Sequence, residues 1–206
     1  MSRLRWPDDR DAVVTHFNAR HSNPEGNALL RYAFDAVDAL HYLADVDAGY
    51  ETTRSVGDHN GDVVDVAHAR WATGTAITAL DLVAAAFGRF FGNHVGPKEL
   101  DFGSFSESNP SKQLRAVLAT VPSLAKQWIS DVNSDSDFLL ISGARDALTH
   151  RRLPRSLCMS FVSGVVEPRL DLRIGSSQVP VGDLVKRSRD LATRHLVDLL
   201  KLLPSL

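Results

Sequence analysis

The sequence predicts an all-α fold, an up-and-down bundle of about five helices with a small β-hairpin inserted before the last helix. Three observations predict it. Through most of the chain, apolar residues recur three or four positions apart, which is the period of an amphipathic helix. Between about residues 157 and 174 apolar and polar residues alternate instead, which is the period of a strand. The 206 residues, 44% of them hydrophobic, are enough to form one core.

Two regions are expected: an N-terminal arm or short docking helix over residues 1–26, and a single helical domain over residues 27–206. The arm is predicted because its sequence is polar and irregular. The first long helix begins at Asn27 and ends near Gly49, since glycine is typical just beyond a helix end. Its apolar stripe is formed by Leu30, Phe34, Val37, His41 and Ala44.

The second helix, from Asp62 to about Phe91, is the longest predicted element. Small residues fill much of it, which permits close neighbours on more than one face. A long loop is expected from Gly92 to Asn109, because glycines and prolines interrupt the helical period there. The predicted apolar side of the helix comprises Val64, His68, Trp71, Thr75, Leu82, Ala86 and Phe90.

A third helix is expected to begin after Ser111 and to be kinked at Pro122, because proline cannot donate to the helical hydrogen-bond ladder. Trp128 lies on its apolar side, and we expect both Trp128 and Trp71 to pack in the core. The polar tract Asp131 to Asp137 predicts a tight turn, so the third helix should end before it.

The fourth helix is expected to begin at Ser136 or Asp137 and to end at Pro154. The hairpin follows it at about residues 157–174, joined through Gly164 and Pro168. An amphipathic last helix begins near Pro180 and Asp183, and its wide apolar face would complete the core.

Composition limits the class of protein. Lys and Arg total 23 and Asp and Glu total 25, a net charge of -2, which argues against bulk DNA binding. The single cysteine, Cys158, excludes an internal disulfide and suits a reducing compartment. The start of the chain has no signal-peptide pattern, and Asp81 and Arg89 interrupt the longest apolar stretch, Thr75 to Phe91. We therefore expect a cytoplasmic protein with no membrane partner.

The run ARDALTHRRLPR, from Ala144 to Arg155, carries the candidate chemistry. It places Arg145, Asp146 and His150 within six residues, and it has four arginines against one aspartate, a formal charge of +3. An imidazole can take the proton of a ribose 2′-hydroxyl, and a guanidinium can neutralise charge on phosphoryl oxygens. Such a site needs no metal or cofactor. The following arginines are candidates for binding the RNA phosphates: Arg151, Arg152 and Arg155.

Residues five apart on a helix lie about 140° apart around its axis. Arg145 and His150 therefore do not share a face of the fourth helix. They could converge only if the helix distorts toward Pro154, or if a symmetric dimer supplies one of them from each chain.

The run resembles the HEPN family of helical-bundle proteins, many of which are metal-independent ribonucleases linked to toxin–antitoxin and phage-defence systems. The family hallmark is Arg, a polar residue, then His after a gap of four to six residues, here Arg145, Asp146 and His150. The resemblance implies a homodimer in which Arg145 and His150 of both chains line one cleft and Asp146 tunes them. It also implies RNA as substrate, and an antitoxin or another protein as partner. It does not cover the arm or the hairpin.

An arginine followed five or six residues later by a histidine also occurs elsewhere in the chain. Two other interpretations of the sequence stay open as well. We favour Arg145 with His150 because an apolar helix leads into them and arginines follow. The recurrences are Arg10 with His16, Arg54 with His59, Arg89 with His94, and Arg189 with His195. The first alternative is a catalytically silent bundle that acts as a protein-interaction module.

The second alternative is a metal-binding bundle. Aspartate and histidine lie three apart, on one helix face, in three pairs: Asp38 with His41, Asp65 with His68, and His195 with Asp198. However, the glutamates that such sites favour fall outside the long helices, and a histidine beside apolar positions is more often a hydrogen-bonded core residue. The sequence thus predicts no metal site.

Overall fold

The computed structural model describes most of the chain from residue 61 onward and scattered positions before it. The described residues are 15, 31, 35, 38–39, 42–43, 45–46, 48–50, 61–92, 102–106, 112–150, 155–162 and 165–205. They form an all-α bundle with an antiparallel hairpin before the last helix, so the predicted fold class is confirmed. The predicted arm, residues 1–26, lies outside the described residues apart from Thr15, which is helical.

Residue contacts divide the chain into two compact units. The first unit comprises Met1–His41, Thr78–Asp135 and Ala192–Leu206, and the second comprises Tyr42–Ile77 and Ser136–Leu191. The long helix α3 and the last helix α7 each contribute to both units.

Helix α3, Gly61–Gly92, begins and ends within one residue of the predicted bounds, but it buries a partly different face. The predicted apolar side is only partly correct, because Ala86 is fully buried but Trp71 is 51% exposed. The fully buried residues are mostly small: Ala69, Ala72, Thr73, Ala76, Ala79, Leu80, Val83, Ala84, Ala86 and Phe87. Alanine lets a neighbouring element approach closely, and close packing outweighs the burial of a larger side chain.

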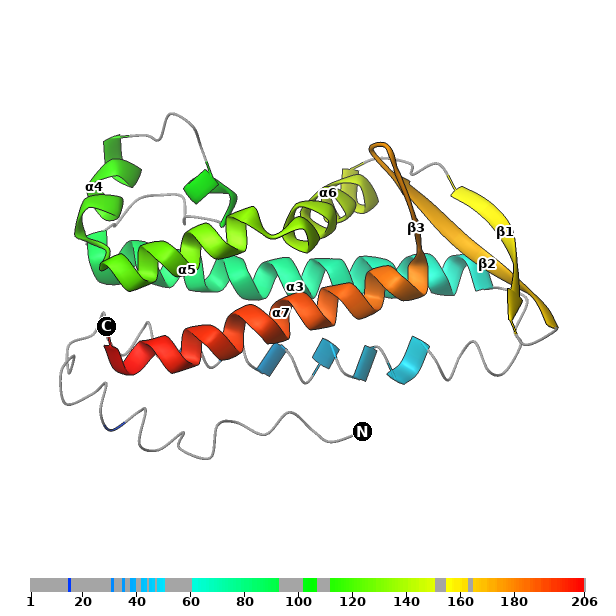
Figure 1. Cartoon of the computed structure of the whole chain (residues 1–206), viewed down its shortest axis with the longest axis horizontal. Helices are drawn as coiled ribbons and strands as arrows, with labels where there is room; N and C mark the ends of the chain where they lie inside the picture. Colours follow the sequence, from blue (N-terminus) through cyan, green and yellow to red (C-terminus); the bar gives the residue numbers. More distant parts are fainter. Residues whose placement is uncertain are drawn as a thin grey trace. The chain divides into compact units, whose positions relative to one another are not determined.

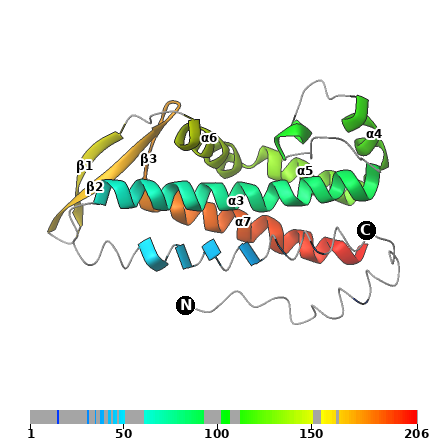
Figure 2. The same cartoon turned by 180° about the vertical axis from the view of Figure 1, so that it is seen from behind.

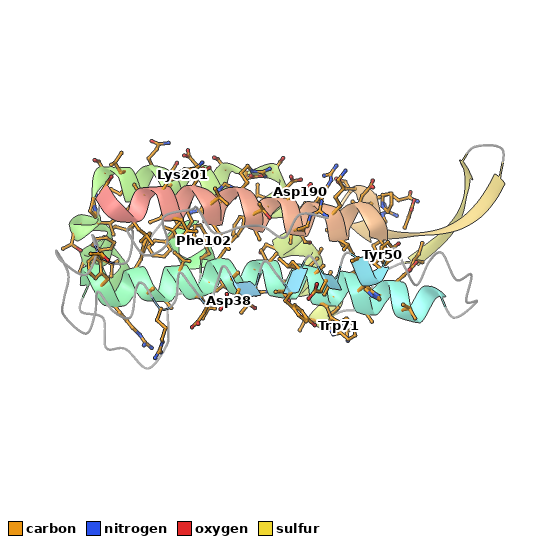
Figure 3. The ribbon with its side chains drawn as sticks, turned by 90° about the horizontal axis from the view of Figure 1, so that it is seen from below. Asp38, Tyr50, Trp71, Phe102, Asp190 and Lys201 are labelled. Atoms are coloured by element: carbon orange, nitrogen blue, oxygen red, sulfur yellow. The ribbon has the colours of Figure 1, made fainter. Side chains whose placement is uncertain are left out.

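The first unit is organised around an aromatic cluster. Trp128 makes edge-to-face contacts with Phe87, at 5.7 Å, and with Phe102, at 5.5 Å between ring centroids. Its indole Nε1 donates to the backbone carbonyl of His195 at 2.9 Å. Phe102 lies between ribbons in Figure 3, and its N–H donates to Oδ1 of Asp81 at 2.7 Å. Part of the predicted loop therefore anchors in the core.

Three short elements complete the first unit: η1 (Gly103–Ser106), α4 (Lys112–Thr120) and α5 (Ser123–Ser134). They lie together near the C-terminal end of α3 (Figures 1 and 2). The chain leaves the helix at Val121 and at Pro122, whose ψ of 153° is extended. The kink predicted at Pro122 is therefore a break between two helices.

The tight turn predicted over Asp131 to Asp137 is wrong. Helix α5 continues to Ser134, and α6 (Ser136–His150) begins two residues later. Asp135 alone leaves the helix, with φ of -71° and ψ of 122°. Side-chain bonds hold the polar residues in the helix: Gln127 Nε2 donates to Asp131 Oδ1 at 2.7 Å, and the Ser134 hydroxyl donates to the Asp131 carbonyl.

The second unit contains a three-stranded antiparallel sheet in the order β1-β2-β3 (Figure 1). The strands are β1 (Arg155–Val162), β2 (Val165–Ile174) and β3 (Ser177–Pro180), and α7 (Val181–Leu202) follows at once. The predicted hairpin corresponds to β1 and β2, although Pro168 lies inside β2 and not in the turn. Strand β3 was not predicted. Gly175, at φ of 60°, turns the chain into it, a conformation that glycine adopts without a Cβ clash.

Tyr50 holds the start of α7 in the second unit. It is 2% exposed, and a Cβ built at Gly182 would lie 3.1 Å from its ring, so only glycine fits without displacement. Val46 is buried one turn before Tyr50 and Leu43 two turns before it, in described residues that are all helical. The apolar stripe predicted for this first helix lies outside the described residues.

Among the described residues one helical segment, Val64–Phe91, is long and apolar enough to cross a membrane by length and composition alone. More than half of its apolar window is buried inside the protein. The buried core helix of a soluble protein also meets these criteria of length and composition.

Replacing Trp128 tests the aromatic cluster. Trp128→Phe removes the donor to the His195 carbonyl and leaves a void, so we expect the free energy of unfolding to fall by about 2–3 kcal/mol. The half-exposed Trp71 provides the control. Trp71→Phe should change the free energy of unfolding by less than about 0.5 kcal/mol. Urea unfolding followed by far-ultraviolet circular dichroism measures both, and equal losses would contradict the assignment of the core.

Candidate functional site

Helix α6 presents the candidate residues opposite and beside its buried face. The buried residues are spaced three, three and four apart: Phe138, Ile141, Ala144 and Leu148. Arg145 lies at the edge of this face with 35% of its side chain exposed, and Asp146 faces solvent with 62% exposed. The sequence therefore places a cation and an anion side by side on a solvent-accessible part of the helix.

Arg145 and Asp146 form an ion pair. The guanidinium Nε donates to Oδ1 of Asp146 at 3.3 Å. An exposed pair of this kind contributes little to stability, because water screens it. Its effect is local: the carboxylate orients the guanidinium and offsets part of its charge.

A second arginine reaches the same part of α6 from α3. Arg70 Nη2 donates to the backbone carbonyl of Leu148 at 2.8 Å. The last carbonyls of a helix have no partner within the helix, and the negative end of its dipole favours a cation, so this contact stabilises the terminus. Arg70 adds a positive charge beside the run, and the half-exposed indole of Trp71 follows it in the chain. The sequence interpretation did not include Arg70.

Helix α6 is α-helical through His150, which fixes where its positions lie around the axis. Arg145 and position 150 lie about 140° apart. The helix is regular up to residue 150. A distortion of α6 before this residue therefore does not bring Arg145 and His150 together within one chain. Position 150 instead lies about 40° from Asp146, one turn later on the same side.

The remaining predicted phosphate-binding residues are less completely placed. The side chain of His150 and the residues Arg151 and Arg152 lie outside the described part of the chain. The backbone of Arg155 begins β1 opposite Leu172, and its side chain is likewise outside that part. The structure thus describes Arg145 and Asp146 fully and His150 by its place on the helix.

His195 belongs to a structural cluster in the first unit. Its ring is 7% exposed, and Nε2 lies 2.8 Å from Oδ2 of Asp135. Arg194 Nη2 donates to the same oxygen at 2.6 Å. In the tautomer that carries its hydrogen on Nε2, His195 donates to the same oxygen as Arg194. The two side chains link α7 to the one non-helical residue between α5 and α6.

The His195–Asp198 pair considered for a metal is not formed as the spacing suggested. Asp198 pairs with Lys201 at 2.9 Å, and the partner of His195 is Asp135. His68 Nδ1 lies 2.9 Å from the carbonyl of Val64, so that nitrogen is the donor. His41 is outside the described residues. Within residues that the structure describes, no three His, Cys, Asp or Glu side chains are grouped to hold a metal ion.

Sequence reasoning missed Asp135. It is the one acidic residue of its tract that leaves the helix, but the predicted turn covers the whole tract and does not single it out. Its partners lie about sixty positions later, at Arg194 and His195, a separation that helical periodicity does not reach.

No known protein family, no curated protein and no solved structure matches this chain.

Removing the carboxylate of Asp135 tests the structural cluster. Asp135→Ala leaves the buried His195 donor without an acceptor, and we expect the free energy of unfolding to fall by about 2–4 kcal/mol. Asp198→Ala removes a carboxylate that is 54% exposed and paired with Lys201, and it should cost less than about 0.5 kcal/mol. Urea denaturation of the two variants measures the difference; similar values would show that Asp135 is not a structural anchor.

Proposed function

We propose that this protein is a HEPN-like, metal-independent endoribonuclease or RNA-binding protein that acts as a homodimer in the cytoplasm. The observation that carries the proposal is the placement of the Arg145 to His150 run. It occupies the last turns of a regular helix, with Asp146 facing solvent and Arg145 accessible at the edge of the buried face. The positive charge of the run and of Arg70 favours a phosphodiester backbone as ligand.

In the proposed reaction His150 takes the proton of a ribose 2′-hydroxyl, and that oxygen attacks the adjacent phosphorus. Arg145 neutralises the charge that develops on the phosphoryl oxygens. Asp146 orients the guanidinium through the bond at 3.3 Å. The bond to the 5′-oxygen breaks and that oxygen takes a proton from water, so the products carry a 2′,3′-cyclic phosphate and a 5′-hydroxyl.

A dimer is proposed because one chain separates the two functional positions around α6. Leu139 supports it: 61% of this leucine is exposed, and it lies about 20° from Asp146 around the helix. An apolar residue, a carboxylate and position 150 thus follow one side of α6. A second copy that covers Leu139 would bring its own Arg145 and His150 toward the first.

A catalytically silent interaction module is the alternative. Four large apolar residues that are 49–61% exposed favour it: Tyr42, Trp71, Leu124 and Leu139. Surfaces of this kind commonly mark contacts with other proteins. An antitoxin-like protein, as the family resemblance implies, would then be the ligand, and RNA would not be cut.

Cleavage of labelled RNA in excess EDTA tests the nuclease proposal. We expect cutting without added metal, products with 2′,3′-cyclic phosphate ends, and a loss of about a hundredfold or more in His150→Ala and in Arg145→Ala. The matched control is Arg187→Ala, which removes an exposed arginine from another helix of the same unit, where it pairs with Asp137. Gel electrophoresis gives the rates, and circular dichroism verifies the fold. If the wild-type protein does not cut the RNA, the nuclease proposal is wrong and the interaction module remains as the alternative.

Mixing two inactive variants tests whether the site is shared between copies. A dimer of Arg145→Ala with His150→Ala retains one intact Arg145 and one intact His150, on different chains. A site that takes one residue from each chain should recover about a quarter of the wild-type rate after equal mixing and exchange, because half of the dimers are mixed and each has one complete site of two. A site within one chain recovers nothing, so an inactive mixture with demonstrated exchange would refute the shared cleft.

A further inference from the structure

An exposed tryptophan on α3 is held in place by two other aromatic rings. Trp71 is 51% exposed and lies at the outer edge of this helix in Figure 3. The ring of His68 contacts it edge-on, at 5.7 Å between centroids, and the ring of Tyr50 lies 5.6 Å from that of His68. Tyr50 is 2% exposed, and Nδ1 of His68 is bonded to the Val64 carbonyl at 2.9 Å. The three rings therefore form a chain from the core to the surface, which fixes the exposed indole.

A fixed and half-exposed indole is suited to binding a flat ligand. Folded proteins commonly bury most of a tryptophan side chain, because it is large and mainly apolar. Trp71 instead leaves half of its surface in water, and its contact with His68 limits the rotamer freedom that it would lose on binding. Trp71 thus offers a rigid aromatic surface on which a planar group can stack.

A cation lies beside this indole. Arg70 precedes it on α3, is exposed, and donates from Nη2 to the Leu148 carbonyl at 2.8 Å, two residues before position 150 of α6. A guanidinium has five N–H donors, and within the described part of the chain Arg70 makes no ion pair with a carboxylate. Its charge is therefore available to an anion at the end of α6.

The two side chains point in different directions from α3. Consecutive residues of a helix lie about 100° apart around its axis and 1.5 Å apart along it. Arg70 reaches α6, so Trp71 projects to one side of the Arg145 to His150 run, in the same compact unit. A ligand that contacts both must carry a negative charge next to a flat apolar group, and an unpaired nucleotide has this combination.

We propose that Trp71 stacks on an unpaired base of single-stranded RNA and that Arg70 contacts a phosphate of the same strand. The inference rests on the proposed function, because it takes RNA as the ligand of the α6 run. Proteins that bind single strands combine cations along the backbone with aromatic rings under the bases. Duplex RNA is a poor ligand, because its bases are stacked on one another and cannot reach an indole. Trp71 is thus a positioning residue that accepts any base.

A 2′-O-methyl oligonucleotide tests the inference separately from cleavage, because it lacks the 2′-hydroxyl that attacks the phosphorus. A fluorescently labelled strand of about twelve nucleotides, alone or annealed to its complement, is titrated with the full chain. Fluorescence anisotropy gives the Kd. We expect the single strand to bind at least about tenfold more tightly than the duplex.

Variants assign the stacking contact. Trp71→Ala should weaken binding of the single strand by about tenfold or more, and Trp71→Phe should keep most of the affinity, because phenylalanine also stacks. Leu124 provides the matched control, since it is apolar and 54% exposed, on α5 of the first unit. Leu124→Ala should bind as the wild type does. Circular dichroism verifies the fold of each variant.

The salt dependence of binding separates the two contacts. Arg70→Gln removes one phosphate contact, so the slope of log Kd against log salt concentration should fall by about 0.7. Trp71→Ala removes an uncharged contact and should leave that slope unchanged while it raises Kd at every salt concentration. A general disturbance of the second unit would not divide the two effects in this way.

The outcomes distinguish this inference from the proposed function. Equal binding of the single strand by Trp71→Ala and the wild type, or equal binding of duplex and single strand, would overturn the inference and leave RNA binding at the α6 run intact. Binding of neither RNA would overturn both. Weaker binding by Trp71→Ala, in a protein that does not cut unmodified RNA, would support the inference and refute only the nuclease.

Discussion

The small-residue face of α3 is the constraint on which both units depend. In the second unit this helix buries Ala69, Ala72 and Thr73, and in the first it buries Ala84 and Phe87. Alanine loses no rotamer freedom on burial and allows neighbouring backbones to approach closely, so dispersion contacts are gained at little entropic cost. The one buried hydroxyl on this face, that of Thr73, donates to the carbonyl of Ala69 at 2.8 Å and so adds no unpaired polar group.

The extent of α3 could be predicted from the sequence and its buried face could not, whereas the wide apolar face predicted for the last helix is buried, as at Leu191, Leu196 and Leu199. The ends of α3 follow from the helical spacing of apolar residues in its own sequence. Pro122 breaks the predicted third helix whatever its packing partners are, because proline cannot donate a backbone hydrogen bond. Which face of a helix is buried depends on the element, often distant in the sequence, that packs against it. Trp71 and Trp128 have the same hydropathy, yet one is 51% exposed and the other 5%, because Trp128 meets a carbonyl that lies 67 positions later.

Polar tracts and short strands were the other source of error. The residues from Asp131 to Ser134 have the composition of a turn, but Gln127 and Ser134 bond to Asp131 and hold them in α5. Strand β3, Ser177–Pro180, is too short for an alternating pattern to stand out, and it exists because the turn at Gly175 folds it back on β2. Composition describes what a segment tolerates, whereas its conformation depends on available partners.

For the candidate site, the sequence predicted Arg145 and Asp146 on a helix, and α6 bears this out; it could not predict Arg70, which lies 78 positions before the carbonyl it contacts. The contact has a further consequence for the proposed dimer. Two copies of Arg145 and Arg70 brought to one cleft repel each other, and the two Asp146 carboxylates offset only part of that charge. A phosphodiester supplies the missing negative charge. In the proposed dimer, RNA binding and pairing of the two chains would therefore favour each other, since each lowers the electrostatic cost of the other.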